Sequence, residues 1–352
     1  MPYSALKPTG SEDILVSIRD VAALAGVSNK TVSRVVNREP NVKPAMIKRV
    51  SAAIDQLGYI PNQAARLVRT NRSRIVGVVT DVVSTTPKSV ELIHGIQDAI
   101  GKTEYSLLIA NTGNDPATEA KIWRTYREQR IDGVLYVTMY HREVDFDPST
   151  HGIATVLVNC FTDPARSVPA TVPDDYQGQY DATCHAIACG HERIGYVTLN
   201  PLILAARLRG QGYRDAMEAH GLPIQSEWIV PGVAGPLDND RLCAFDAAKR
   251  ILSLSAAERP TLLLAGNDEI AMQCLFAAHA LGLKVPADIA IIGFDDFRII
   301  SDQVVPRLTT VALPYYDIGA RAAERLLAMI SGAPVEYGIE TVACPIVPGG
   351  TT

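Results

Sequence analysis

Two short apolar patterns joined at a glycine stand near the start of the chain. Ser17 with Asp20 makes an imperfect capping box for a first helix, Gly26 permits a tight turn, and Ser28 can cap a second helix. The apolar positions recur at helical spacing and are Val21, Leu24, Ala25, Val27, Val32, Val35 and Val36. The pattern predicts two short helices packed across a turn, which is a helix-turn-helix.

A third helix is predicted over Pro44–Leu57, because proline and Gly58 favour its two ends and its apolar residues form one face. Residues 59–70 follow, a basic segment too short to be stable as a lone helix in water. On DNA such a segment could form a minor-groove helix with Arg66 and Arg69 near phosphates, or it could be a basic linker. The residues alone leave both alternatives open.

The second helix is expected to present polar side chains outward. Amide and guanidinium groups such as those of Asn29, Lys30 and Arg34 can reach base edges and phosphates in a major groove, and Thr31 and Ser33 suit phosphate contacts. The alternative is a small three-helix bundle whose surface happens to be polar. DNA binding is the favoured interpretation.

The distribution of charge supports this interpretation. The whole chain of 352 residues carries a formal net charge of −5, but residues 1–74 hold 12 basic and 5 acidic residues, a net charge of +7. The remaining 278 residues therefore carry −12. A basic N-terminal segment next to an acidic body is typical of a protein whose first part contacts phosphates.

From residue 74 onward, apolar strand-like runs alternate with helical patterns. The predicted strands are 75–80, 105–110, 133–138, 154–158, 194–199, 228–230, 261–265 and 289–294, and the predicted helices are 89–100, 116–130, 179–188, 209–220, 240–253 and 269–281. The alternation predicts βαβ units and parallel sheets. Pro164, Pro169 and Pro173 suggest a break near residues 165–175, between two doubly wound halves.

Polar side chains follow most of these strands. They are Asp81, Asn111, Asn159, Asn200, Asn267, Asp268, Asp295 and Asp296. Ligands of open α/β sheets bind at the carboxyl ends of the strands, and two such edges would surround a hydroxyl-rich small molecule, such as a sugar, with amide and carboxylate groups. The alternative for any one of these residues is ordinary helix capping or turn formation.

The sequence has no run of about 18 apolar residues that could span a bilayer and no signal-peptide pattern at its start, so we expect a cytoplasmic protein without a membrane partner. Its six cysteines lack paired spacing and are expected to be free thiols. The cluster Cys184, His185, Cys189 and His191 does not have the spacing of zinc ligands. Neither a metal nor a cofactor is predicted.

The motifs Asp20-Val-Ala, Gly26-Val-Ser, Thr31-Val-Ser-Arg-Val-Val-Asn37 and Gly58-Tyr-Ile-Pro-Asn62 resemble those of the lactose-repressor and galactose-repressor (LacI/GalR) family of bacterial regulators. The resemblance implies a homodimer that binds a near-palindromic double-stranded operator. The residues that it implies for DNA binding are Ser28, Asn29, Lys30, Thr31, Ser33, Arg34, Asn37, Asn62, Ala65, Arg66, Val68 and Arg69. Val68 replaces the family's usual leucine wedge, and Lys43 replaces the Ser or Thr that usually caps the third helix.

The resemblance extends over the body, through Gly190-His-Glu-Arg-Ile-Gly195, Gly266-Asn-Asp-Glu269 and Gly293-Phe-Asp-Asp296. It implies a two-lobed core like that of periplasmic sugar-binding proteins, with a small-molecule effector, a carbohydrate or related polyol, in the cleft. Its implied contacts are Asp81, Asn159, Arg209, Asn267 and Asp295. Asn159 stands in place of a frequent aspartate, and Lys88 in place of a frequent aromatic residue.

The expected domains are a flexible extension (1–16), a helix-turn-helix domain (17–60), a hinge helix or linker (61–73) and an effector-binding core (74–352). The resemblance implies three chain crossings between the lobes, with the N-lobe at about 74–172 and 310–338 and the C-lobe at about 173–309 and 339–352.

The leading function is an effector-responsive transcriptional regulator, most often a repressor in this family. An enzyme is not predicted, because the sequence has no nucleophile elbow, Walker loop or Gly-x-Gly-x-x-Gly turn after its first strand. The alternative is a solute-binding protein of the sugar-transport type without catalytic activity, which would carry an export signal and no basic N-terminal segment.

Overall fold

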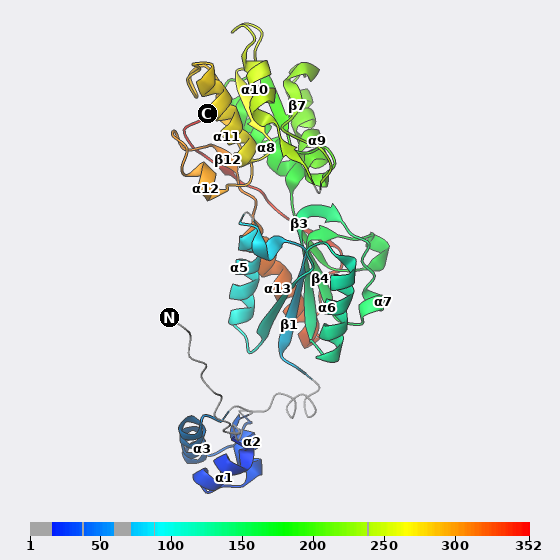
Figure 1. Cartoon of the computed structure of the whole chain (residues 1–352), viewed down its shortest axis with the longest axis vertical. Coiled ribbons are helices and arrows are strands. Elements are labelled where there is room, and N and C mark those ends of the chain that lie inside the picture. Colours follow the sequence, from blue (N-terminus) through cyan, green and yellow to red (C-terminus); the bar gives the residue numbers. More distant parts are fainter. Residues whose placement is uncertain (1–15, 37–38, 60–71, 88, 238) are drawn as a thin grey trace, which may run out of the picture. The chain divides into compact units, whose positions relative to one another are not determined.

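The computed structural model describes residues 16–36, 39–59, 72–87, 89–237 and 239–352. The chain divides into two compact units, Met1–Ser73 and Arg74–Thr352. Each unit is taken by itself below, and Figure 1 shows the elements of both.

The first unit is a three-helix bundle of α1 (Ile18–Ala25), α2 (Asn29–Val36) and α3 (Pro44–Leu57). Gly26 ends α1 in the left-handed conformation, with φ of 60°, and Gly58 ends α3 in the same way. The helices enclose a small core of buried side chains, namely Val21, Ala22, Ala25, Val32, Val50 and Ala53. The predicted helix-turn-helix and third helix are thus confirmed.

One expectation about this core was wrong. Leu24 is 46% exposed, because the buried face of α1 is formed by Val21, Ala22 and Ala25, which leaves Leu24 on the outer side. Ile47 of α3 is likewise 43% exposed.

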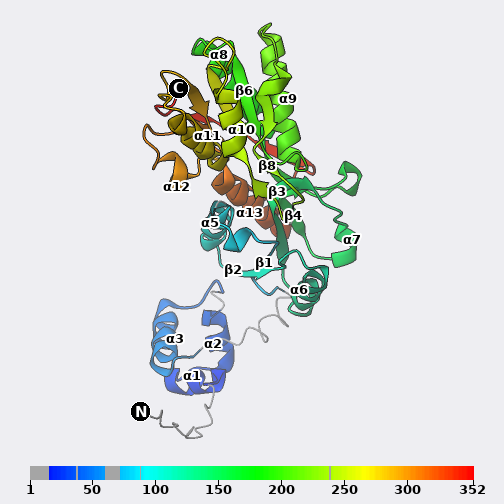
Figure 2. The same cartoon turned by 45° about the horizontal axis from the view of Figure 1, so that its top comes forward.

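The N-lobe of the second unit is built on a six-stranded parallel sheet in the order β13-β5-β4-β3-β1-β2. The strands are β1 (Ile75–Thr80), β2 (Ser106–Asn111), β3 (Gly133–Glu143), β4 (Thr155–Phe161), β5 (Ala170–Pro173) and β13 (Ile339–Val342). Helices α5 (Val90–Gly101) and α13 (Tyr315–Ser331) cover one face, and α6 (Pro116–Glu128) covers the other, as Figure 2 shows. The short helices η1 (Val83–Thr85), α7 (Pro148–His151) and η2 (Pro164–Arg166) lie in its connections.

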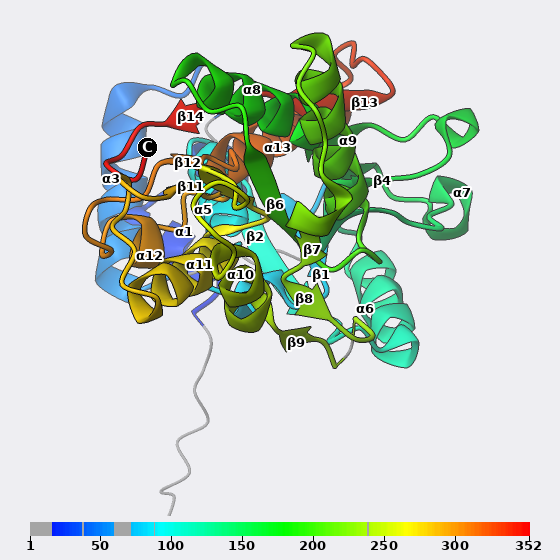
Figure 3. The ribbon, with the colours of Figure 1, turned by 90° about the horizontal axis from the view of Figure 1, so that it is seen from above.

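The C-lobe is built on a four-stranded parallel sheet in the order β11-β10-β6-β7. Its strands are β6 (Ile194–Thr198), β7 (Ile229–Pro231), β10 (Leu262–Ala265) and β11 (Ala290–Ile292). Helices α8 (Asp175–Ala188) and α9 (Leu204–Ala219) lie on one face, and α10 (Ala244–Leu252) and α11 (Asp268–Ala280) lie on the other, as Figure 3 shows from above. The remaining elements are η3 (Ser226–Trp228), α12 (Arg298–Ser301), the hairpin of β8 (Val233–Ala234) and β9 (Arg241–Leu242), and the pair β12 (Thr310–Val311) and β14 (Ile346–Val347). The predicted fold class, parallel α/β lobes behind a helix-turn-helix, is confirmed.

Three details of the core differ from the sequence-based expectation. The proposed break at residues 165–175 contains β5, which pairs with β4 and β13 inside the N-lobe sheet. Residues 339–342, expected in the C-lobe, form β13 in that same sheet. Residues 310–311, expected in the N-lobe, form β12, which pairs with β14. The residues on either side of β12, Thr309 and Ala312, form β-bridges with Ile292 at the end of β11 and with Asp295 just after it. The chain passes between the two lobes between β5 and β6, between β12 and α13, and between β13 and β14.

Several helix starts were also placed too late. Helix α8 begins at Asp175 and α9 at Leu204, each about one turn before the predicted start. In the described part of the chain, no helix is both long and apolar enough to cross a membrane.

Candidate functional site

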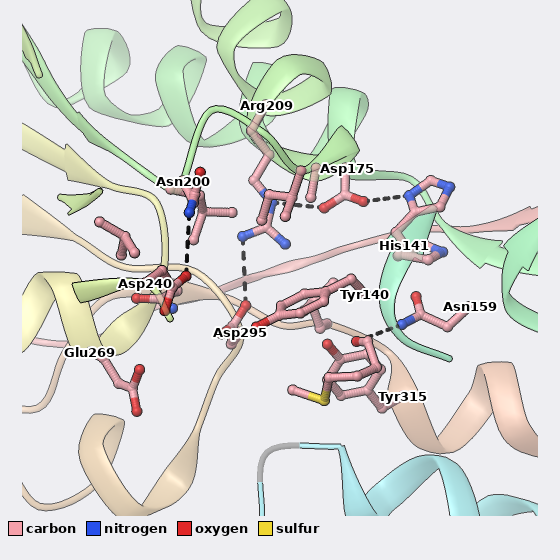
Figure 4. Close-up of a pocket in the computed structure, with 18 of the residues that line it drawn as sticks. Tyr140, His141, Asn159, Asp175, Asn200, Arg209, Asp240, Glu269, Asp295 and Tyr315 are labelled. Atoms are coloured by element: carbon pink, nitrogen blue, oxygen red, sulfur yellow. Dashed lines mark hydrogen bonds and ion pairs between the residues drawn. The ribbon is translucent and has the colours of Figure 1, made fainter. Parts of the chain in front are cut away.

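A cavity of about 200 Å³ lies between the two lobes, at the carboxyl ends of their parallel strands. Residues 139–141 come from β3 and Asn159 from β4, whereas Asn200, Asn267 and Asp295 follow β6, β10 and the β11 segment. Figure 4 shows Tyr140, Asn159, Asn200 and Asp295 around one space. Such a strand-end cavity between doubly wound lobes is the expected place for a small ligand.

Arg209 projects from α9 into the wall of this cavity and is only 3% exposed. Its Nε donates to Asp175 Oδ1 at 2.7 Å, and its Nη1 donates to the carbonyl oxygen of Gly266 at 2.6 Å. Nη1 also lies 3.6 Å from Asp295 Oδ1, and the guanidinium carbon lies 3.5 Å above the centre of the Phe294 ring. The guanidinium is therefore fixed in position before any ligand arrives.

Asp175, at the start of α8, is buried and joins groups of both lobes. Its second oxygen is 2.8 Å from Nδ1 of His141, a residue of β3 in the N-lobe. Burial by itself would raise the pKa of Asp175, but the charge of Arg209 and the hydrogen bond from His141 outweigh it and hold this pKa below its usual value. The carboxylate is therefore ionised and links the lobes through Arg209 and His141.

Asn159 lies on the N-lobe side of the cavity with a positive φ of 57° and is 1% exposed. Its Nδ2 donates to the carbonyl oxygens of Thr138 and Met139, each at 3.0 Å. Its Oδ1 is buried and has no hydrogen-bond donor among the described residues. An unpaired buried acceptor in a cavity wall is suited to receive a hydrogen bond from a ligand.

Asn267 has a partly structural role, because its Oδ1 caps α11 by accepting from the backbone N–H of Ile270 at 2.9 Å. The next residue, Asp268, is fully buried and accepts from the Thr310 hydroxyl and the Phe297 N–H, each at 2.6 Å. Burial and the neighbouring charge of Asp295 raise the pKa of Asp268 to about 8. These contacts hold the strained turn in which Asp295 has a φ of 115°.

The structure brings four of the five predicted effector contacts, Asn159, Arg209, Asn267 and Asp295, to this cavity; their role in binding stays a prediction. Asp81 is placed differently. Its carboxylate accepts from the backbone N–H of Met139 at 3.0 Å and pairs with Arg142 at 3.3 Å, so it ties the end of β1 to β3 and lies outside the described cavity lining.

Sequence reasoning missed several lining residues, namely Tyr140, His141, Asp175, Asn200, Asp240, Glu269 and Tyr315, as members of the site. Asp175 had a usable signal, because it follows β5, the strand hidden among prolines. Asn200 was noted as a strand-end residue but not assigned to the site. Tyr140 and His141 lie in the unexpected extension of β3 beyond residue 138.

In the first unit, Asn29 and Lys30 are exposed at the start of α2, as expected for reading residues. Ser28 Oγ accepts from the Thr31 N–H at 3.2 Å, which confirms the predicted cap, whereas Lys43 provides no side-chain cap to α3. Arg34 donates to Glu39 and to the Pro40 carbonyl oxygen, both at 3.3 Å. Six of the predicted DNA contacts lie outside the described residues, namely Asn37, Asn62, Ala65, Arg66, Val68 and Arg69. Lys88, which was noted in the effector-binding core, also lies outside them.

The cysteine and histidine residues considered above do not gather at one point. Cys189 Sγ lies 3.8 Å from Nε2 of His185, whereas Nδ1 of His191 is hydrogen-bonded to the Thr261 hydroxyl. Within the described residues, no group of three or more His, Cys, Asp or Glu side chains could hold a metal ion.

A helix-turn-helix unit followed by a two-lobed core with a polar interlobe cavity defines a ligand-binding transcriptional regulator. Two family models match the chain: bacterial regulatory proteins of the lacI family over residues 17–62, and periplasmic binding proteins and sugar binding domain of LacI family over residues 73–344. The chain belongs to the LacI family of bacterial regulatory proteins.

Individual relatives agree with this assignment. Catabolite control protein A of Priestia megaterium is 33% identical over 326 residues, covering 92% of this chain and 95% of that protein. The sucrose operon repressor of Escherichia coli is 31% identical over 338 residues, covering 95% of this chain and 98% of that protein. The crystal structure of a LacI-family transcriptional regulator from Rhizobium etli is similar with a TM-score of 0.74 and 42% identity, covering 80% of this chain and 99% of that one. The second of these relatives is named as an operon repressor, and the third is described as a transcriptional regulator.

Proposed function

We propose that this protein is a transcriptional repressor whose homodimer binds a near-palindromic operator and whose DNA affinity is controlled by a small carbohydrate-type effector in the interlobe cavity. The observation that carries the proposal is the pairing of a helix-turn-helix with a cavity walled by strand ends of both lobes. The family description of the core as a sugar-binding domain and the name of the sucrose operon repressor support a carbohydrate. The function requires binding and no chemical step.

The effector would be held by Asn159, Arg209, Asn267 and Asp295. Asn159 belongs to one lobe and the other three to the second, so a ligand that contacts both lobes favours their closed arrangement. An effector changes DNA affinity only through its different affinities for two arrangements, typically about 1–3 kcal/mol. The contacts from His141 to Asp175 and from Asp175 to Arg209 cross between the lobes, so we expect them to change when the effector closes the lobes.

The operator would be read by α2, with Asn29, Lys30 and Arg34 at base edges and phosphates. Arg34 has to exchange its contacts with Glu39 and Pro40 for contacts with DNA. Two copies are required because one helix reads one half-site, and half-sites about one turn apart need a dimer.

The core offers an apolar face for the second copy. Val90 of α5 and Ile299 of α12 border the same hollow and are 44% and 65% exposed, and Phe276 of α11 is 51% exposed. Figure 1 shows α5, α11 and α12 on the same side of the core. Burying exposed apolar side chains of this size is the usual driving force of a homodimer interface.

The experiment is a selection of binding sites from random duplex DNA with the full chain, followed by titration of the selected duplex. We expect an inverted repeat, bound with steep salt dependence. Lys30→Ala should weaken binding and flatten the salt dependence, whereas Lys249→Ala, an exposed lysine of α10 in the core, should change neither. Equal binding to every duplex, or an unaltered Lys30→Ala titration, would reject the proposed DNA-binding role of the first unit.

A further inference from the structure

One side of the interlobe cavity is lined by aliphatic side chains of the C-lobe. Leu199 and Ile203 follow β6, and Val233 and Leu242 belong to the hairpin of β8 and β9. Val233 pairs directly with Leu242 in this hairpin, and directly opposed side chains of an antiparallel pair lie on the same face. We call these four residues the aliphatic wall.

The packing of the C-lobe core does not account for the whole aliphatic wall. Ile203 and Val233 pack against the core with part of their surface, but Leu242 is not among the described side chains that form or border it. Leu242 is instead 42% exposed and lines the cavity. An apolar side chain in this position offers its surface to a ligand.

Asn200, a polar residue on the same side of the cavity, is engaged by the protein. Its Nδ2 donates to the carbonyl oxygen of Gly235 at 3.0 Å and lies 3.4 Å from Asp240 Oδ2. Its Oδ1 accepts from the backbone N–H of Leu202 at 3.1 Å. These contacts tie the hairpin to the segment after β6, so the aliphatic wall is held in place by the protein itself.

The opposite side of the cavity offers hydrogen bonding. Asn159 Oδ1 is buried there without a donor among the described residues, and its Nδ2 is fixed by two backbone carbonyl oxygens. In Figure 4, Asn200 and Asp240 lie to one side of Arg209, and Asn159 lies to the other. The cavity therefore has a hydrogen-bonding end and an aliphatic end.

The size of the cavity limits the ligand further. Its volume of about 200 Å³ equals that of about seven water molecules at about 30 Å³ each, which is room for one sugar ring and not for two. A second sugar ring would also bring hydroxyl groups against the aliphatic wall, and burying a polar group without a partner is unfavourable. An alkyl or aryl group in the same place gains affinity by leaving water.

We infer that the effector is an amphipathic glycoside, a single sugar ring that carries an alkyl or aryl group. The inference rests on the proposed function and deepens it. The sugar hydroxyl groups face Asn159 and Arg209, and the apolar group lies against Ile203, Val233 and Leu242.

The test is calorimetry and thermal shift with the full chain. The probes are glucose, galactose and mannose, each as the free sugar and as both anomers of its methyl and its butyl glycoside, together with the disaccharides cellobiose, maltose and lactose. Each fully buried methylene raises affinity about fourfold. We therefore expect a butyl glycoside, whose chain is partly buried, to bind about tenfold or more tightly than the methyl glycoside of the same sugar and anomer.

Variants locate the effect. Leu242→Gln, and independently the isosteric Val233→Thr, should lower the affinity ratio of butyl to methyl glycoside, whereas Leu254→Gln should leave it unchanged. Leu254 is a matched control, because it is 41% exposed and lies outside the described cavity lining.

The outcomes separate this inference from the proposed function. A butyl glycoside that binds no better than its methyl glycoside, or a disaccharide that binds as tightly as the best butyl glycoside, would overturn the inference and leave the carbohydrate effector standing. A preference that survives unchanged in both cavity variants would also overturn it. No binding of any of these compounds would reject both the apolar group and the carbohydrate effector.

Discussion

Replacing Arg209 by methionine should destabilise the core far more than a surface substitution does. The change keeps much of the apolar stem but removes the partner of a buried carboxylate, because Asp175 would retain only His141. It also leaves the carbonyl oxygen of Gly266 without its donor. Breaking a buried ion pair from one side costs about 3–5 kcal/mol, so we expect a loss of about 4 kcal/mol in the free energy of unfolding.

The size of this loss should depend on pH in a defined direction. Without the guanidinium, burial raises the folded-state pKa of Asp175 above its unfolded value of about 3.9. A group with a raised folded-state pKa favours the native state in its protonated form, so the penalty grows as pH rises from about 4. The difference in the free energy of unfolding between wild type and variant should therefore be smaller at about pH 5 than at about pH 7.5.

The assay is denaturant unfolding followed by the fluorescence of Trp123 in the N-lobe and Trp228 in the C-lobe. Arg214→Met, an exposed arginine on the same helix α9, is the matched control and should cost less than about 0.5 kcal/mol. Adding Asp175→Asn to Arg209→Met should recover about 2 kcal/mol, because it removes the uncompensated charge. A loss below about 1 kcal/mol, or a double variant less stable than the single one, would refute the reasoning.

The other predictions concern different parts of the chain. Asp268 has a pKa raised to about 8, so its protonated form favours folding and stability should fall as pH rises toward 8, by up to about 1.4 kcal/mol per pH unit; Asp268→Asn should flatten this slope in unfolding titrations, and an unchanged slope would contradict the assignment. Arg34→Ala should cost about 1–3 kcal/mol on the selected operator and relax specificity at one position, measured by anisotropy against single-base variants; unchanged affinity would remove Arg34 from the reading residues. Phe276→Lys should shift the protein toward monomer in sedimentation analysis without altering its circular dichroism, and a dimer that persists at low concentration would place the interface elsewhere.

The order of elements was predictable from the sequence because short apolar runs, typical of strands, alternate along the chain with longer segments whose apolar residues recur at helical spacing. Strand β1 and helix α3 begin and end where the pattern placed them, since proline and glycine mark the ends of α3 and charged residues flank β1. Strand β5 was missed because Pro169 and Pro173 resemble a linker. In the structure Pro169 directly precedes the strand and Pro173 is its last residue, and at these two ends a missing N–H is tolerated.

The site was partly predictable for a related reason. A polar residue after a strand indicates that it lies at the ligand edge, and this was sufficient for Asn267 and Asp295. It does not indicate which way the side chain turns, and Asp81 turns toward the backbone of Met139. The pairing of Asp175 with both Arg209 and His141 joins three elements far apart in sequence, which no local pattern encodes.

The three crossings between the lobes also constrain how members of this family can exchange parts. The N-lobe needs residues near 75–173 and 315–342, and the C-lobe needs the segment between them together with β14 near the end of the chain. A single recombination inside the core would therefore combine strands of two parents within one sheet. The first unit, by contrast, is one continuous segment that ends at Ser73. A single junction there therefore exchanges the DNA-binding specificity and leaves the ligand-binding core whole.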